Sequence, residues 1–268
     1  MTRHRFGTST NVPVPTHERR MRRRPVLLIA VGSGMRQSRV GFYTSGRLSL
    51  DGIFAVPDTT GGPFPGVVVC HPHPVLGGDM ENPVVTAICH ALVRSDIATL
   101  RFDFRGVGES QGEFANGDKE EDDLRAAISM LGSLPGVDKR RIAVAGYSFG
   151  AGVLLGAIGR MKSVRSMVAI APPLSTVRRS PIVRDERPKL FVVGRLDKVA
   201  PSVELQAEMD AMKPPVEFAD IPDADHTLAG HEIAVAERVV EFLAPTLGPE
   251  PQGGRSLMSW ARSILPYR

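Results

Sequence analysis

The feature that most limits the fold of this chain is an alternation of two patterns. Short apolar runs rich in β-branched residues alternate with helical patterns of about 10 to 18 residues. This alternation is typical of a mostly parallel sheet with helices on both faces, an α/β fold. We predict eight strands, at 39–43, 48–56, 66–70, 97–102, 141–145, 166–171, 189–193 and 216–220. We predict helices near 82–95, 117–134, 149–161, 202–212 and 232–243.

The predicted strands differ in how deeply they should be buried. The runs 67–70, 142–145 and 168–171 lack alternation between apolar and polar residues, as expected for central strands covered on both faces. A short turn that contains Thr44, Ser45 and Gly46 joins the first two predicted strands, and so short a turn permits only an antiparallel pair.

Length and composition favour one globular domain with extensions. The chain has 268 residues, of which 42% are hydrophobic and 23% charged. A protein of this size buries about three quarters of its unfolded surface, enough for a core without disulfides. We place the domain at 35–245, with a basic, disordered extension at 1–34 and a linker with a short amphipathic tail at 246–268. An alternative is that Met35 is the first residue of the native protein.

The charge is unevenly distributed. Residues 1–34 hold seven arginines and one acid, so this segment carries +6 and the remainder −2. Because the body is close to neutral, we predict no binding of nucleic acid. The longest apolar run, Val26–Val31, has six residues, which is too short for stable membrane insertion. Cys70 and Cys89 form neither a metal-binding nor a disulfide pattern, which favours a cytoplasmic location.

A candidate nucleophile follows the strand predicted at 141–145, in the sequence Gly146-Tyr147-Ser148-Phe149-Gly150. A serine on a sharp turn from strand to helix takes strained backbone angles, and glycines on either side remove side chains that would collide. The turn should force the Ser148 hydroxyl out above the sheet, beside free N–H groups of the following helix. The alternative interpretation is an ordinary Gly-rich helix start packed on a strand.

A serine hydroxyl needs a base to take its proton and a carboxylate to hold that base. His226 is the candidate base, because of seven histidines it alone lies in a loop after the last predicted strand. Asp197, just after the strand at 189–193, is the candidate acid. Both residues follow the C-terminal ends of strands, where parallel sheets place their ligands.

Three other acids compete with Asp197 for this role. Asp225 is adjacent to His226, so the two side chains diverge, and Asp223 is too near in sequence to orient the ring easily. Asp103 competes more seriously, but the sequence Asp103-Phe104-Arg105-Gly106-Val107-Gly108 is better suited to buried turn hydrogen bonds.

The loop after the strand at 66–70 should supply part of an oxyanion hole. The tetrahedral intermediate of acyl transfer needs two N–H donors, one from the residue after the nucleophile, Phe149, and one from this loop. Prolines lack an N–H, which leaves His71, His73 or Val75. His73 is preferred from its position just past the strand.

Two rival interpretations concern the same loop. The sequence His71-Pro72-His73 resembles part of a metal site, which would need Asp79 or His226 as a further ligand. Cys70 could be a nucleophile, but at the end of a strand it is expected to pack as a small hydrophobe. We predict neither a metal nor a cofactor.

Taken together, these motifs resemble the α/β-hydrolase superfamily over about residues 37–245. The segments 71–82, 104–110 (FRGVGES) and 146–152 (GYSFGAG) are similar to small capless bacterial hydrolases related to dienelactone hydrolase. The resemblance implies an eight-stranded sheet with its second strand antiparallel, and a triad of Ser148, Asp197 and His226. The dienelactone type uses cysteine where this chain has Ser148, so a dienelactone hydrolase is less favoured than the other members of this group.

In the α/β-hydrolase superfamily that this chain resembles, a lid is normally inserted at the position between the strands at 166–171 and 189–193. Only residues 172–188 connect them here, too few for a helical cap domain, so the site should be open. Arg178, Arg179, Arg184 and Arg187 in this connection could attract anionic substrates, although a solvated polar loop is the simpler interpretation.

The function predicted from the sequence is a serine hydrolase that cleaves carboxylic esters of short or accessible acyl groups through an acyl-enzyme. Its partner would be a small-molecule acyl substrate, and a homodimer is one option for its assembly. The first alternative is a peptidase or thioesterase of the same fold. The second, from another class, is a non-catalytic ligand-binding or scaffold protein.

Overall fold

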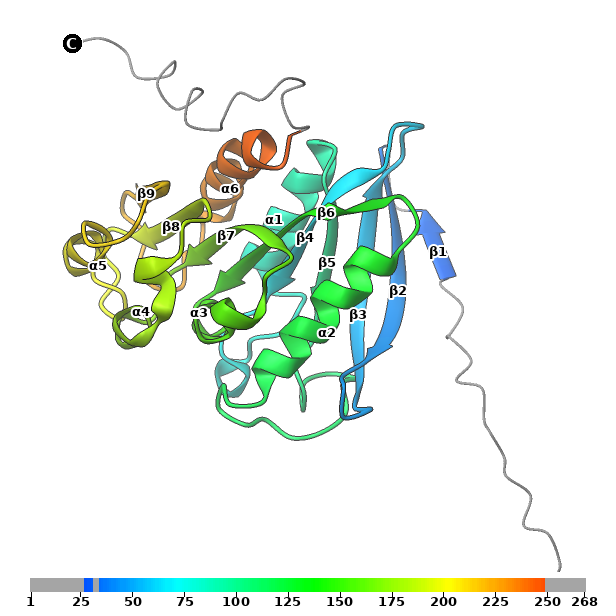
Figure 1. The fold of residues 1–268 in the computed structure, drawn as a ribbon, viewed down its shortest axis with the longest axis horizontal. Coiled ribbons are helices and arrows are strands. Elements are labelled where there is room, and N and C mark those ends of the chain that lie inside the picture. Colours follow the sequence, from blue (N-terminus) through cyan, green and yellow to red (C-terminus); the bar gives the residue numbers. More distant parts are fainter. Residues whose placement is uncertain (1–26, 31–33, 249–268) are drawn as a thin grey trace, which may run out of the picture.

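The computed structural model describes residues 27–30 and 34–248, and within them nine strands form one sheet (Figure 1). The strands are β1 (Leu27–Ala30), β2 (Met35–Tyr43), β3 (Ser49–Pro57), β4 (Phe64–Cys70), β5 (Ala98–Phe102), β6 (Val137–Tyr147), β7 (Val164–Ile170), β8 (Lys189–Gly194) and β9 (Val216–Ile221). The helices are α1 (Pro83–Arg94), α2 (Glu120–Ser133), α3 (Phe149–Ala157), α4 (Leu174–Arg179), α5 (Ser202–Met209) and α6 (Glu232–Thr246). Three short 3₁₀ turns are η1 (Pro74–Leu76), η2 (Ile158–Arg160) and η3 (Pro181–Arg184).

The strand order in the sheet is β1-β2-β3-β5-β4-β6-β7-β8-β9. In this order, the six strands β5, β4, β6, β7, β8 and β9 are all parallel to their neighbours within that group. By contrast, β3 is antiparallel to both β2 and β5. The expected mostly parallel α/β sheet, with its second predicted strand antiparallel, is therefore confirmed, with the eight predicted strands present as β2–β9. All the parallel strands end at one edge of the sheet.

The strand β1 is an addition to the expected sheet. It pairs antiparallel with β2, with Leu27 opposite Arg39 and Ala30 opposite Arg36. These four residues belong to the segment 1–34, for which we expected a disordered extension, and they contribute a strand instead. The rest of that segment except Gly34, and the expected tail from residue 249 onward, lie outside the described residues.

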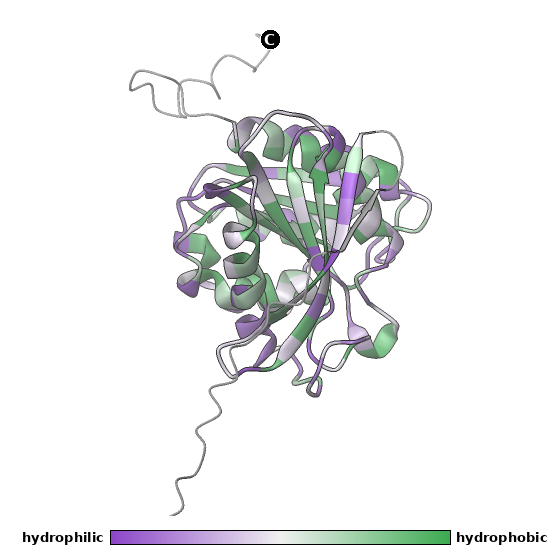
Figure 2. Ribbon diagram, turned by 90° about the vertical axis from the view of Figure 1, so that its right-hand side faces the viewer, coloured by the Kyte–Doolittle hydropathy of each residue, from purple (hydrophilic) through white to green (hydrophobic). Residues whose placement is uncertain are grey.

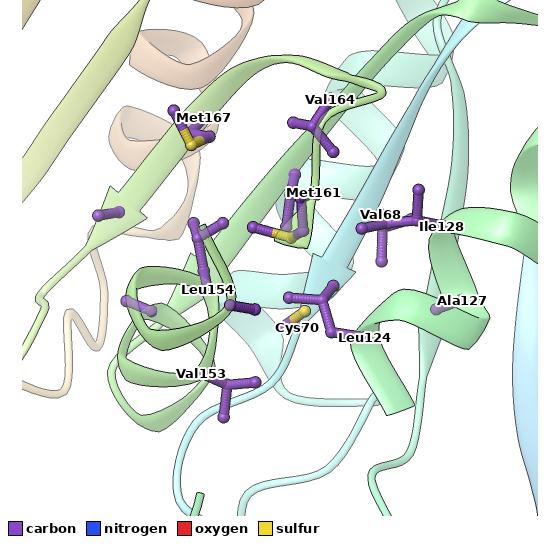
Figure 3. Close-up of a cluster of buried hydrophobic side chains, with 14 of the residues drawn as sticks. Val68, Cys70, Leu124, Ala127, Ile128, Val153, Leu154, Met161, Val164 and Met167 are labelled. Carbon is purple, nitrogen blue, oxygen red and sulfur yellow. The ribbon is translucent and has the colours of Figure 1, made fainter. Parts of the chain in front are cut away.

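Two hydrophobic clusters cover the two faces of the sheet. Figure 2 shows helices on both sides of the sheet. One contains buried residues of α2, α3, α4 and α5, and the other contains buried residues of α1 and α6. Figure 3 shows part of the first cluster, where Leu124 of α2 and Leu154 of α3 lie near Cys70 at the end of β4. Because helices cover both faces, the runs 67–70, 142–145 and 168–171 of the central strands are apolar and buried, as their sequence predicted.

The connection between β7 and β8 folds onto the body of the protein. It contains α4 and η3, and Leu174, Val177 and Ile182 bury their side chains in the first cluster. No cap domain is inserted at this point of the sheet, as predicted. Of the four arginines in this connection, Arg187 binds Asp185 and Arg178 binds Glu204 and Glu208, while anion attraction by this loop stays an alternative prediction. Within the described residues, no helix has the length and apolar character needed to cross a membrane.

Candidate active site

Ser148 stands on a strained turn between β6 and α3. Its backbone has φ +50° and ψ −106°, a region that residues with a side chain rarely adopt. The turn is held because the Ser148 N–H donates to the Ile170 carbonyl at 2.8 Å and the Ser148 carbonyl accepts the Gly152 N–H at 3.0 Å. Neighbouring elements therefore fix the strained conformation.

The two glycines of the Gly146–Gly150 motif are required by close approach. A Cβ on Gly146 would lie 2.4 Å from the Gly150 carbonyl oxygen. A Cβ on Gly150 would lie 2.7 Å from the Cys70 carbonyl oxygen and 2.8 Å from that of His71. Larger residues would push α3 away from the ends of β4 and β6, and would move the serine with it.

The imidazole of His226 lies directly against the Ser148 hydroxyl. Ser148 Oγ and His226 Nε2 are 2.9 Å apart, although the residues are 78 positions apart in the sequence. Tyr147 fixes the loop after β9 that carries the histidine, since its hydroxyl lies 3.0 Å from the His226 carbonyl oxygen and 2.9 Å from that of Thr227. Tyr147, which is next to Ser148 in the sequence, thus holds the backbone of His226 in place.

Asp197 completes the line of polar groups. Its Oδ2 lies 2.8 Å from His226 Nδ1, and its Oδ1 accepts the N–H groups of Val199 and Ala200 at 2.7 and 2.8 Å. Burial opposes ionisation of this carboxyl, but hydrogen bonds from His226 and from those backbone groups outweigh it, and the pKa of Asp197 lies below its ordinary value. The ionised carboxylate holds the proton of the ring on Nδ1. A neutral His226 then has Nε2 free to accept the proton of Ser148.

The competing acids lie elsewhere. Asp103 Oδ1 accepts the Met80 N–H at 2.8 Å and its carbonyl oxygen accepts the Ser110 hydroxyl at 2.7 Å, so it makes the buried turn bonds expected of it. Burial raises the pKa of Asp103 to about 6. Asp225 is exposed and binds Thr227. Of the aspartates considered, the structure brings Asp197 to the histidine.

Comparison with known proteins agrees with this geometry. The family model described as serine aminopeptidase, S33, matches residues 75–234, which include Ser148, Asp197 and His226. This chain belongs to the serine aminopeptidase S33 family. An α/β serine hydrolase homologue from Coxiella burnetii is 30% identical, with 82% of this chain and 97% of that chain covered and a TM-score of 0.65. An α/β serine hydrolase without a lid, from Xanthomonas campestris, is 26% identical, with 83% and 100% covered and a TM-score of 0.70.

Curated relatives of this S33 family member match over shorter stretches. The chain spans about half the length of the curated relatives it matches. Among them, a thiohydrolase of Aspergillus aculeatus is 26% identical over 151 residues, which cover 55% of this chain and 45% of that protein. The family and the α/β serine hydrolase fold are therefore shown.

The two residues expected to donate N–H groups to an oxyanion lie side by side in the S33 chain. Phe149 is the first residue of α3, and the ring centroids of His73 and Phe149 are 5.2 Å apart. The Val75 N–H, which the sequence left open as a donor, instead binds His73 Nδ1 at 3.2 Å. The side chain of His73 thus closes its own turn, and His73 stays the expected donor from this loop.

The pair His71 and His73 does not offer two free ligands for a metal. His71 Nε2 accepts the Phe104 N–H at 3.1 Å, so the proton must sit on Nδ1, which donates to the Pro72 carbonyl at 2.7 Å. Burial lowers the pKa of His71 to about 4, which keeps the ring neutral. Within the described ranges no group of three His, Cys, Asp or Glu side chains is arranged to bind a metal ion. Cys70 is buried, and burial raises the pKa of its thiol, as expected of a packing residue.

Two residues near the site were not found by sequence reasoning. Tyr147 occupies the variable position of the nucleophile motif, and its role depends on a loop about 80 residues away. Phe114, in the loop between β5 and α2, packs its ring against both His73 and Phe149. Neither has a local sequence signal, because both roles arise from contacts between distant segments.

Proposed function

We propose that this protein is a serine hydrolase of carboxylic esters that works through an acyl-enzyme. The observation that carries the proposal is the continuous line of hydrogen bonds from Ser148 to His226 at 2.9 Å and from His226 to Asp197 at 2.8 Å. Such a line makes a serine hydroxyl nucleophilic at neutral pH. It joins three loops at the carboxyl edge of the sheet, and a purely structural role requires no such convergence.

In the proposed reaction, His226 takes the proton of Ser148 while Oγ forms a bond to the ester carbonyl carbon. The carbonyl oxygen becomes an oxyanion, held by the backbone N–H groups of His73 and Phe149. When the oxyanion collapses, the bond to the alcohol oxygen breaks, and the alcohol leaves with the proton from His226. Water then loses a proton to His226 and attacks the acyl-enzyme, which releases the acid and returns the proton to Ser148. Asp197 stays ionised and stabilises the imidazolium throughout.

The decisive experiment removes the proposed nucleophile. We expect Ser148→Ala to lower kcat on nitrophenyl acetate by about a million-fold, because removing a triad serine removes the covalent step. Ser129→Ala, an exposed serine of α2, is the matched control and should keep full activity. A folded Ser148→Ala protein that retains most of its turnover would contradict the proposal.

Peptidase or thioesterase activity is the second candidate. It is favoured by the family description and by the thiohydrolase relative, whose names refer to amide and thioester substrates. Ester, thioester and amide substrates with the same acyl group distinguish esterase, thioesterase and peptidase activity, and we expect the ester to give the highest kcat/KM.

A fluorophosphonate probe distinguishes a serine hydrolase from a non-catalytic scaffold. If the protein is a serine hydrolase, the probe should label the wild-type protein and not Ser148→Ala. We also propose a small-molecule acyl substrate and a cytoplasmic location, consistent with the free thiols of Cys70 and Cys89.

A further inference from the structure

Three partly exposed aromatic rings pack against one another beside the nucleophile. The ring centroids of His73 and Phe114 are 5.2 Å apart, those of His73 and Phe149 are 5.2 Å apart, and those of Phe114 and Phe149 are 5.3 Å apart. These are the distances at which aromatic pairs attract one another beyond simple burial. Two members of this triangle are the proposed oxyanion donors. The third, Phe114, has no part in the chemistry proposed above.

The two donor residues come from separate segments. His73 belongs to the loop after β4, where its carbonyl oxygen accepts the N–H groups of Leu76 and Gly78 at 3.1 and 3.0 Å. The hydrogen bonds of this turn are thus largely internal to the loop. Phe149 belongs to α3 on the other side of the nucleophile. The distance between their N–H groups therefore depends on how the two segments pack, through the backbone contact at Gly150 and through the side chains of His73 and Phe149.

Neighbouring groups hold the backbone on both sides of Phe114. A Cβ on Gly106 would lie 2.8 Å from the Phe114 nitrogen, so the two parts of its loop are in direct backbone contact. On the other side, the fully buried carboxylate of Glu120 accepts the N–H groups of Ala115 and Gly117 at 2.7 and 2.8 Å. The backbone beside Phe114 is therefore fixed both before and after the residue.

We propose that Phe114 is a positioning residue, whose ring holds His73 and Phe149 at the separation that an oxyanion requires. This proposal rests on the proposed function and extends it to a segment that no motif marks. Oxyanion stabilisation requires both donors within about 2.7 to 3.1 Å of the same oxygen, which forms only in the transition state. Loss of the ring should therefore lower kcat and leave ground-state binding largely intact.

The test compares Phe114→Ala and Phe114→Leu with two controls. Phe114→Tyr keeps the ring, and Phe218→Ala removes another partly buried phenylalanine, on β9. On nitrophenyl acetate we expect kcat to fall about 10- to 100-fold in Phe114→Ala, less than the loss of a whole donor because the N–H groups remain. KM should stay within a factor of about two, and inhibition by phenylboronic acid, which forms a tetrahedral adduct with the serine, should weaken by the same factor as kcat/KM. The tyrosine variant should restore activity, and Phe218→Ala should resemble wild type.

Several outcomes overturn the proposal. A raised KM with unchanged kcat would make Phe114 a substrate contact instead, and equal losses in Phe218→Ala would indicate general destabilisation. Unchanged kinetics in a folded Phe114→Ala protein would remove the proposal while leaving the Ser148 mechanism in place. If wild type itself is inactive, the proposed function fails, and NMR relaxation of the His73 and Phe149 amides still tests the packing. Those amides should become more mobile in Phe114→Ala and not in Phe218→Ala, and unchanged mobility would refute the proposal.

Discussion

The two carboxylate oxygens of Asp197 have different partners, and this division decides what a substitution there would do. Oδ1 accepts two backbone N–H groups, from Val199 and Ala200, while Oδ2 faces His226 Nδ1. In Asp197→Asn the amide oxygen must replace Oδ1, because N–H groups need an acceptor. The amide NH₂ then faces Nδ1, so the ring must carry its proton on Nε2 and cannot accept the proton of Ser148.

We therefore expect Asp197→Asn to keep the fold and to lower kcat by about 10⁴-fold through the wrong tautomer. Steady-state kinetics with a nitrophenyl ester at pH 7 measure the loss, and circular dichroism checks that the protein is folded. Asp225→Asn, at an exposed carboxylate next to His226, is the control and should change kcat little. Near-normal turnover in Asp197→Asn would mean that this carboxylate does not control the state of the ring.

His71 makes stability depend on pH. Its folded pKa of about 4 lies below the ordinary value of 6.5, so the unfolded chain binds a proton more readily than the folded protein. The stability from the neutral ring is complete above pH 6.5 and is lost as the pH falls toward 4. Asp103 affects stability in the opposite direction. Because its pKa is raised to about 6 in the folded protein, the folded state gains stability as the pH falls. The two effects oppose each other over the same range, so the wild-type curve alone hides both.

Variants separate these contributions. Urea unfolding at pH 7 and at pH 5 should show that the destabilisation by His71→Asn shrinks by about 2 kcal/mol at the lower pH, from a shift worth 1.36 kcal/mol per pKa unit. Asp103→Asn should show a destabilisation that grows at pH 5. A penalty for His71→Asn that does not change with pH would mean that the ring binds its proton equally well in the folded and the unfolded states.

At the scale of elements, the loops after β8 and β9 carry the acid and the base, and Gly194 lets them meet. A Cβ on Gly194 would lie 2.4 Å from the Ala224 carbonyl oxygen and 2.6 Å from that of Asp225. The same oxygen of Ala224 accepts the Leu196 N–H at 2.9 Å. The two loops are thus bonded backbone to backbone, which keeps the Asp197–His226 distance fixed.

We expect Gly194→Ala to force the two loops apart, to lower the free energy of unfolding by about 1 to 3 kcal/mol as overpacking does, and to reduce kcat. Gly159→Ala is the matched control, because a Cβ there meets no atom within 4 Å. Urea unfolding and esterase kinetics on both variants make the comparison. Equal behaviour of the two alanine variants would show that the close approach at Gly194 is not needed.

The elements also show what the sequence could and could not predict. The strands β4, β7 and β8 were predictable because each contains an apolar run whose burial follows from local composition. The helix α4 was missed, since six residues are too few for a helical period to be recognised. The pairing of β1 with β2 was missed because it depends on a partner strand. Ser148, Asp197 and His226 could be chosen because each follows a strand end, whereas Phe114 and Tyr147 act through contacts between segments far apart in the sequence.

At the scale of the whole molecule, the apolar faces of the helices are buried against the sheet in the two hydrophobic clusters. The helix in the β7–β8 connection is also buried against that body, so this connection supplies no cap over Ser148. Apolar side chains do lie near the site, since Val75, Leu76, Leu196 and Val199 are exposed on the loops beside His73 and Asp197. In the proposed reaction, a bound acyl group would lie against these exposed side chains.

This openness predicts how activity depends on acyl length. Each methylene buried on binding contributes about 0.8 kcal/mol, so an enclosed site gains nearly fourfold per carbon, and an open one gains only over the first few carbons. In a series of nitrophenyl esters from acetate to palmitate, measured below micelle-forming concentrations, we expect kcat/KM to be highest for short chains and then to fall. Ser148→Ala measured in parallel corrects for spontaneous hydrolysis. Highest efficiency on chains of 12 carbons or more would contradict the open site, because only an enclosure could take that many methylenes out of water.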